Sequence, residues 1–228
     1  MTFDKFFVRR IFMSLFGVII CAISVGAFKL AALGVDPFQS FMAGMDALIP
    51  ISFGTLYTIV NIILLAFSLI FYRRNIGLAT FINMFLLGYI TQYSYEFFMN
   101  VFPEPSMVFR FAALIIAVVV ICFGSAFYMT ANLGVSTYDA VAITLVEKWH
   151  LWKFKYIRIC TDLVCVIAGC VIFVIAGHEI KEIPTIAGIG TIITAFFMGP
   201  LIDFFNNKIA IPFLNKGKQE DYKLEEQL

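Results

Sequence analysis

The sequence predicts an all-α polytopic membrane protein: six transmembrane helices as two inverted three-helix repeats, each with a short interfacial or re-entrant helix. Three observations lead to this fold class. The 228-residue chain is 61% hydrophobic and only 14% charged, whereas soluble proteins carry about 25% charged residues. It contains six apolar runs of about 20 residues, the length that a helix needs to cross a bilayer. One part of the chain is also echoed about a hundred residues later, as an internal repeat would be.

The six apolar runs are the predicted spans. Each is apolar on every side, unlike the amphipathic helix of a soluble protein, and at ~1.5 Å per residue each can cross ~30 Å of hydrocarbon. In chain order they are Ile11–Leu33, Phe53–Tyr72, Ile76–Phe98, Phe111–Leu133, Phe154–Ala176 and Thr185–Phe205.

Lys and Arg residues give the expected orientation, since they concentrate on the cytoplasmic side of a membrane protein. If the N-terminus is inside, the inner segments hold thirteen Lys and Arg residues, and the outer ones hold only Arg110 and Lys181. Both termini are therefore predicted to be cytoplasmic. The formal net charge is +1 and there is no basic block, which argues against a nucleic-acid partner.

The internal duplication defines the predicted domains. Residues 32–39 (ALGVDPFQ) return as 132–139 (NLGVSTYD), and residues 77–82 (GLATFI) return as 188–193 (GIGTII). Residues 1–108 thus form a first three-span repeat, residues 109–207 a second, and residues 208–228 a cytoplasmic tail. Because three is odd, the second repeat is inverted relative to the first. Inverted repeats build many secondary transporters, whose substrate site lies near the midplane between the halves.

A shorter segment follows the first span of each repeat, at Asp36–Ile49 and Ser136–Trp149. Fourteen helical residues cover only about 21 Å, too little to cross the bilayer. Asp36 is a predicted N-cap ahead of Pro37, with Gln39 in the first turn, and Ser136 with Asp139 forms a predicted capping box. The two helices either lie flat in the interface or dip in as re-entrant half-helices whose positive ends point at a central site.

Polar side chains at membrane depth are the remaining candidates for the substrate site, because they are costly there. Lys29, near the end of the first span, either snorkels to the surface or holds an anion. Asn61 and Asp162 occupy corresponding positions near mid-depth in the second span of each repeat. Asp162 either pairs with Arg158, four residues earlier, or takes up a proton or cation. The candidate substrate-binding residues are Lys29, Asp36, Gln39, Asn61, Ser136, Asp139 and Asp162.

No enzyme, cofactor or metal site is expected. The chain has no Gly-rich phosphate loop, no catalytic motif and no Cys/His cluster, and successive cysteines at 160, 165 and 170 point to different sides of a helix. The glycine pairs Gly77 with Gly88 and Gly188 with Gly199 are each eleven residues apart. They predict a stripe of small residues on which helices pack closely.

The Leu-Gly-Val repeat at 32–39 and 133–139, with the glycine-containing third spans, resembles the YczE/YyaS/YitT family of bacterial integral membrane proteins. This resemblance covers most of residues 11–205. It implies a bacterial inner-membrane protein of five or six spans and supplies no catalytic residues.

The expected function is secondary transport of a small solute or ion through a site between the repeats. The alternative is a membrane-embedded substrate-binding or regulatory subunit of a larger complex, with no transport activity of its own. The expected partners are the lipid bilayer and a small solute, and both a homo-oligomer and a membrane partner subunit stay open.

Overall fold

The computed structural model describes residues 5–152 and 154–216, and within these residues the chain is helical and contains no β-strand. Short helical turns lie at Arg73–Asn75, Ile180–Thr185 and Asn206–Ala210. The eight α-helices are α1 (Lys5–Ala31), α2 (Pro37–Leu48), α3 (Phe53–Phe71), α4 (Leu78–Val101), α5 (Met107–Thr130), α6 (Thr137–Glu147), α7 (Phe154–Ile175) and α8 (Ile189–Phe205).

Five stretches of the described chain are helices long and apolar enough to cross a membrane. Their outward faces carry large apolar side chains, such as Ile63 at 63% and Phe196 at 73% exposure, as lipid contact requires. The five are Phe6–Ala31, Phe53–Phe71, Met107–Thr130, Tyr156–Ile175 and Ile180–Lys216.

The remaining predicted span, Ile76–Phe98, corresponds to α4, which is 24 residues long but is not among the five apolar stretches. Polar side chains explain the difference: Thr80, Asn83 and Thr91 are buried along it, and Gln92 hydrogen-bonds Glu96 near its end. Asn83 faces α3, where Tyr57 donates to it, Thr91 faces α1, where it donates to Ala22, and Thr80 faces the loop before α6. Composition therefore identifies five apolar spans where the sequence predicted six.

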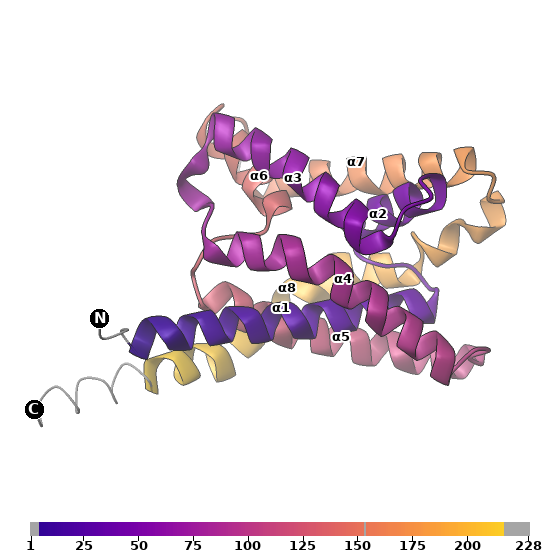
Figure 1. The fold of residues 1–228 in the computed structure, drawn as a ribbon, viewed down its shortest axis with the longest axis horizontal. Coiled ribbons are helices and arrows are strands. Elements are labelled where there is room, and N and C mark those ends of the chain that lie inside the picture. Colours follow the sequence, from indigo (N-terminus) through magenta and orange to yellow (C-terminus); the bar gives the residue numbers. More distant parts are fainter. Residues whose placement is uncertain (1–4, 153, 217–228) are drawn as a thin grey trace, which may run out of the picture.

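Helices α1 and α5 pack against each other and run antiparallel along the lower side of the bundle in Figure 1. Arg10 near the start of α1 contacts Ala131 just after α5, and Cys21 farther along α1 contacts Ile121, earlier in α5. The backbones approach closely between these points, because a Cβ added to Gly17 would lie 2.6 Å from the carbonyl oxygen of Gly124. The first spans of the two sequence copies are thus packed side by side in opposite directions.

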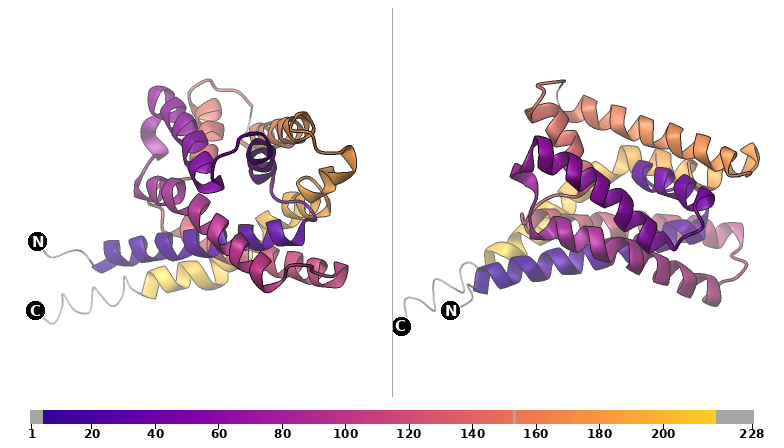
Figure 2. Two further views of the ribbon diagram at one scale, coloured as in Figure 1. Left: turned by 45° about the vertical axis from the view of Figure 1, so that its right-hand side comes forward. Right: turned by 45° about the horizontal axis from the view of Figure 1, so that its top comes forward.

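The short helices pack on helices of the other sequence copy (Figure 2). Helix α2 lies along α7, and a Cβ added to Gly44 would come within 2.3 Å of the Gly169 carbonyl oxygen. Helix α6 lies along α3, where Asn61 meets Thr137. Each copy therefore contributes one short helix to the other.

The two ends of the bundle can be named by their residues. At the Arg9 end, Arg9 donates a hydrogen bond to the carbonyl oxygen of Phe213 at 3.1 Å, so the start of α1 lies beside the end of the described chain. At the Lys29 end, the Lys29 ammonium lies 3.6 Å from the ring centroid of Phe53. This contact places the end of α1 beside the start of α3.

The predicted glycine stripe is confirmed in one repeat only. A Cβ on Gly88 would lie 2.7 Å from the Cβ of Tyr57, whereas a Cβ on Gly199 would meet nothing within 4 Å. Gly199 was therefore wrongly predicted to lie at a close helix contact. The reason is that α4 is enclosed by α1 and α3, whereas α8 packs on α5 and leaves its other side exposed.

Candidate functional site

The loops that precede the two short helices cross to the opposite sequence copy. In the first copy, the N–H of Gly34 donates to the Thr185 carbonyl oxygen at 3.2 Å. In the second, the N–H of Val135 donates to the Asn75 carbonyl oxygen at 3.1 Å. Both loops need glycine: φ is +97° at Gly34 and +118° at Gly134, a region that residues with a Cβ rarely adopt.

Hydroxyl groups add a hydrogen bond to each of these two loop contacts. Ser40 Oγ donates to the Ile186 carbonyl oxygen at 2.6 Å, and Thr80 Oγ1 donates to the Val135 carbonyl oxygen at 2.6 Å. Both hydroxyl-bearing residues are fully buried, so these bonds satisfy groups that would otherwise be costly inside the bundle. The starts of α2 and α6 are thereby fixed against α8 and α4.

The predicted helix caps are confirmed at both short helices. The Gln39 N–H donates to Asp36 Oδ1 at 3.2 Å, and the Asp139 N–H donates to Ser136 Oγ at 3.1 Å. Ser136 Oγ also donates to a carboxylate oxygen of Asp139 at 2.7 Å. Asp36 and Ser136 therefore begin the helices as the sequence indicated, but the Asp139 carboxylate bonds the Ser136 hydroxyl and not the Ser136 N–H that the predicted capping box would use.

The first turns of α2 and α6 meet inside the bundle. The ring of Phe38 stacks on the ring of Tyr138 with 4.9 Å between centroids. The opposite helix ends lie apart: Asp46 of α2 pairs with Lys29 at 3.4 Å, whereas Trp149, after α6, contacts Phe71 at the far end of α3. The short helices therefore start together and run towards opposite ends of the bundle (Figure 1).

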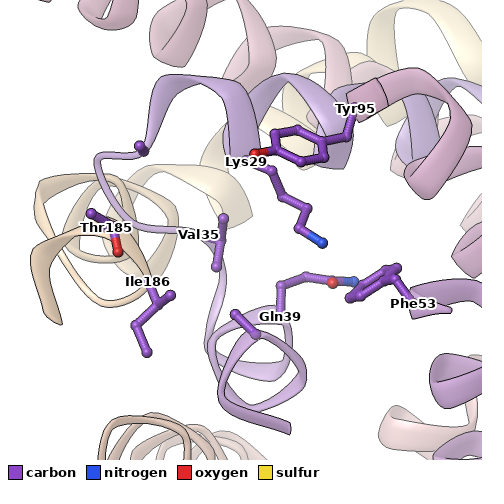
Figure 3. Close-up of a pocket in the computed structure, with 9 residues that line it drawn as sticks. Lys29, Val35, Gln39, Phe53, Tyr95, Thr185 and Ile186 are labelled. Atoms are coloured by element: carbon purple, nitrogen blue, oxygen red, sulfur yellow. The ribbon is translucent and has the colours of Figure 1, made fainter. Parts of the chain in front are cut away.

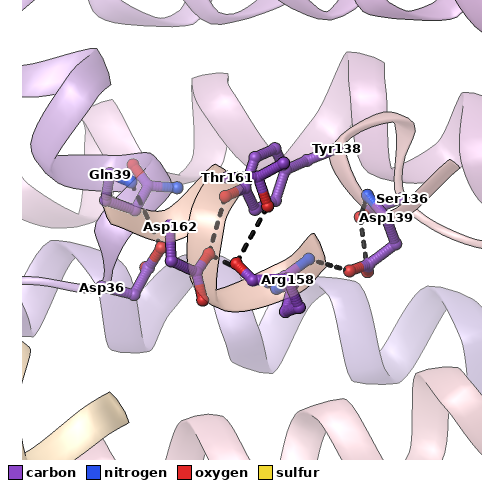
Figure 4. A network of polar contacts seen from close by, with 8 residues as sticks. All are labelled: Asp36, Gln39, Ser136, Tyr138, Asp139, Arg158, Thr161 and Asp162. Atoms are coloured by element: carbon purple, nitrogen blue, oxygen red, sulfur yellow. Dashed lines mark hydrogen bonds and ion pairs between the residues drawn. The ribbon is translucent and has the colours of Figure 1, made fainter. Parts of the chain in front are cut away.

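A charged network surrounds this meeting point (Figure 4). The Arg158 guanidinium pairs with Asp139, and its Nε lies 3.4 Å from Asp162 Oδ1. The guanidinium also lies over the ring of Tyr138, 4.4 Å from its centroid, and the Tyr138 hydroxyl donates to Asp162 at 2.6 Å. Asp36 lies within electrostatic reach of both Arg158 and Asp162. Two carboxylates thus contact one guanidinium, and Asp36 lies nearby.

Asn61 links the network to the first repeat. Its side-chain amide donates to the Tyr57 carbonyl oxygen at 2.7 Å, and its oxygen accepts a hydrogen bond from Thr137. Asn61 and Thr137 are each only 1% exposed. Asn61 therefore fixes the start of α6, and both the nitrogen and the oxygen of its side-chain amide are hydrogen-bonded within the protein.

A cavity of about 190 Å³ opens at the Lys29 end (Figure 3). The Lys29 ammonium and the Gln39 amide point into it beside Phe53, and Tyr95 lies across from them. Gln39 also sits in the first turn of α2 beside Asp36, so it borders both the cavity and the charged network. The cavity is lined by Lys29, Ala32, Val35, Gln39, Ala43, Phe53, Tyr95, Thr185 and Ile186.

A second cavity, of about 340 Å³, lies between α3, α7 and the two short helices. The surface that lines it is apolar, although Thr161 and Tyr138 are among its residues. Because Phe38 and Tyr138 line it, this space reaches the stacked rings from the side of the bundle opposite to α1.

The structure thus gathers the predicted candidates. Asp36, Gln39, Ser136, Asp139 and Asp162 lie in one network, Asn61 joins it through Thr137, and Lys29 lies in the adjoining cavity. Sequence reasoning missed Tyr138, Thr137 and Tyr95. For Tyr138 a signal existed, since Phe38 and Tyr138 hold the same position in the two copies. Among residues 5–152 and 154–216, no three His, Cys, Asp or Glu side chains are arranged to hold a metal ion.

Comparisons with known proteins agree with a membrane protein. The model of a family of unknown function (DUF6198) matches residues 8–207. An uncharacterized membrane protein of Bacillus subtilis, YczE, is 25% identical over 190 residues, 82% of this chain and 81% of its own. An uncharacterized protein of Haemophilus influenzae is 23% identical over 203 residues, 89% of this chain and 85% of its own. No solved structure matches the chain. The resemblance to YczE-like proteins is confirmed, and the chain is a multi-pass membrane protein.

Proposed function

Because the chain belongs to DUF6198, a family of unknown function, its activity has to be inferred from the site, and we propose that it is a secondary transporter. It moves a small solute or ion through the space where the first turns of α2 and α6 meet. The observation that carries this proposal is the stacking of Phe38 on Tyr138, with Asp36 and the Arg158 network beside them.

An inverted repeat is supported by the antiparallel packing of α1 on α5 and by the crossing loops. In the bond from Gly34 to Thr185, the loop before the short helix of the first copy contacts the segment before the last span of the second copy. In the bond from Val135 to Asn75, the same two segments are paired with the copies reversed. Such an exchange is what a twofold axis between two inverted units produces. In this arrangement α4 is the sixth crossing, and its buried polar groups are shielded from lipid by α1 and α3.

Re-entrant placement of the short helices is supported by their length and direction. With 12 and 11 residues, α2 and α6 reach only about 16–18 Å. Both start at the meeting point and run to opposite ends of the bundle. Their N-terminal N–H groups and positive dipole ends therefore converge on one region, as in transporters built from discontinuous helices.

The charge balance of the network indicates what the site handles. Asp36, Asp139 and Asp162 together carry three potential negative charges against one positive charge on Arg158. An uncompensated excess of negative charge is expensive at membrane depth. A proton or a cation at this network restores the balance, so we assign Asp162 the role of the coupling group.

The proposed location is the bacterial inner membrane with both termini in the cytoplasm, supported by the thirteen inner and two outer basic residues. The Arg9 end is then cytoplasmic, and the cavity beside Lys29 opens outward. No chemical step is assigned to the protein.

The test is uptake into proteoliposomes, with solutes first selected by thermal shift of the purified protein, since a ligand that binds the folded state raises its melting temperature. Gradient-driven accumulation of a selected solute supports the proposal. A solute that binds without crossing, together with stoichiometric copurification of a membrane partner, would identify a binding or regulatory subunit instead.

A further inference from the structure

An arginine at the Arg9 end ties α1 to the loop that leads into α6. Arg10 Nε donates to the carbonyl oxygen of Ala131 at 2.7 Å, and its Nη2 donates to that of Asn132. These carbonyls stand at the end of α5, where helical partners are missing. A guanidinium can donate to both at once because its N–H groups form a planar fork.

The sequence repeat supplies the same elements at the other end. At an offset of one hundred residues, Arg110 corresponds to Arg10, and Ala31 and Ala32 correspond to Ala131 and Asn132. The backbone supports this correspondence, since Ala32 and Asn132 both have φ of 50°. Yet Arg110 donates instead to the carbonyl oxygen of Pro105 at 3.2 Å, in the loop between α4 and α5.

A second pair of positions shows the same asymmetry. At the Arg9 end, Thr130 Oγ1 donates to Asn206 Oδ1 at 2.8 Å and joins α5 to the end of α8. The match of Gly77 with Gly188 places Tyr95 at the position that corresponds to Asn206. Leu30 stands where Thr130 does and has no hydroxyl, so this hydrogen bond has no counterpart at the Lys29 end. Tyr95 instead lies with its ring centroid 5.4 Å from the Lys29 ammonium and lines the cavity of about 190 Å³. The Thr130–Asn206 bond therefore closes the Arg9 end at the position where the Lys29 end holds a cavity.

We propose that Arg10 and Arg110 are alternating latches, and that the structure is the state with the Arg10 latch closed and the Lys29 end open. In the opposite state, Arg110 donates to the carbonyls of Ala31 and Ala32, while Arg10 releases Ala131 and Asn132. Equivalent hydrogen bonds are exchanged, so the two states stay close enough in free energy to interconvert. This inference rests on the proposed transport function. The two arginines determine from which side of the membrane the site is accessible.

The test compares two single-cysteine reporters in a background without native cysteines. Ala43→Cys lies in the open cavity, and Ile143→Cys lies at the corresponding half-buried position of α6. Each is labelled with a membrane-impermeant maleimide in vesicles of both orientations. Before any latch is altered, position 43 should react from the Lys29 side faster than position 143 reacts from the Arg9 side.

Arg10→Gln should then slow labelling at position 43 and accelerate it at position 143, by about tenfold in the ratio of rates, because the closed state loses two hydrogen bonds. Arg110→Gln should not lower the rate at position 43. Arg74→Gln is the control, since it removes a positive charge at an exposed position between α3 and α4 and should leave the ratio unchanged. If Arg10→Gln fails to fold, Arg10→Lys keeps the charge but not the fork and should shift the ratio in the same direction.

Two results distinguish failure of the latch proposal from failure of the transport proposal. If both reporters react, each from its own side, but substitution of Arg10 or Arg110 does not change the ratio of the two labelling rates, the latch assignment is wrong. The transport proposal is then unaffected. If position 143 stays unreactive in all variants while position 43 reacts, access does not alternate, and the latch falls together with the transport function on which it rests.

Discussion

The ring of Phe38 lies on the ring of Tyr138 with an interplanar angle of 20°, and the two residues are one hundred positions apart in the chain. Each is the second residue of its short helix. The pair is therefore where the two copies of one sequence element touch, and it lines the cavity between α3 and α7 next to the charged network.

The first prediction concerns this stack. Phe38→Ala should lower the free energy of unfolding by about 3–5 kcal/mol, because a large buried ring is lost. A double-mutant cycle with Tyr138→Ala should give about 0.5–1.5 kcal/mol of coupling. Denaturant unfolding in detergent measures both. Phe12→Ala, which removes a ring that is 57% exposed and stacked on Phe16, is the control and should cost much less.

The second prediction concerns the balance of charge around Arg158. Arg158→Gln leaves Asp139 and Asp162 without their cation and should lower the melting temperature, by roughly 2–4 °C for each kcal/mol lost. Asp162→Asn should cost less, since Arg158 keeps its pair with Asp139. Combining the two substitutions should recover part of the loss. Equal melting temperatures for all three variants would show that the network contributes nothing to stability.

The third prediction separates coupling from structure at Asp162. The proposed function requires that Asp162→Asn folds and binds the solute but loses its dependence on the proton or cation gradient, because the amide cannot exchange a proton in this range. Counterflow and gradient-driven uptake in proteoliposomes distinguish exchange from coupled accumulation. An Asp162→Asn protein that still accumulates solute against its gradient removes this residue from the mechanism.

The fourth prediction uses two glycines of nearly equal φ. Gly34 (φ +97°) and Gly177 (φ +96°) both sit in the left-handed region, but a Cβ on Gly34 would lie 2.3 Å from the Gly188 nitrogen, whereas one on Gly177 meets nothing within 4 Å. Gly177→Ala should cost only the backbone strain, about 1–2 kcal/mol. Gly34→Ala should cost clearly more, because the crossing loop must move. Thermal unfolding compares the two, and similar losses would argue against a tight crossing.

The fifth prediction is the topology. Asn100 in the last turn of α4 and Glu179 in the loop after α7 are both exposed, and cysteines placed there should react with an impermeant reagent from outside intact cells. A cysteine at exposed Leu151, between α6 and α7, should react only after permeabilisation. Labelling of position 151 in intact cells would overturn the inverted arrangement, because an outer position 151 means that the chain crosses the membrane an odd number of times before α7.

The sequence by itself determined the elements of this protein. Runs of apolar residues indicated where the long helices lie, because their periodicity and length are local properties, and Asp36 and Ser136 marked the helix starts because capping acts within one turn. The echo of residues 32–39 at 132–139 also paired the candidate residues of the two halves.

Only the tertiary structure decided what these elements touch. That α2 packs on α7 and α6 on α3, that Arg158 bridges Asp139 and Asp162, and that Lys29 pairs with Asp46 all depend on chain segments distant in sequence. The asymmetry between Arg10 and Arg110 is the sharpest case. Near-identical sequence positions make different hydrogen bonds, because which carbonyl an arginine reaches is set by how the helices are packed, and local sequence carries no record of that choice.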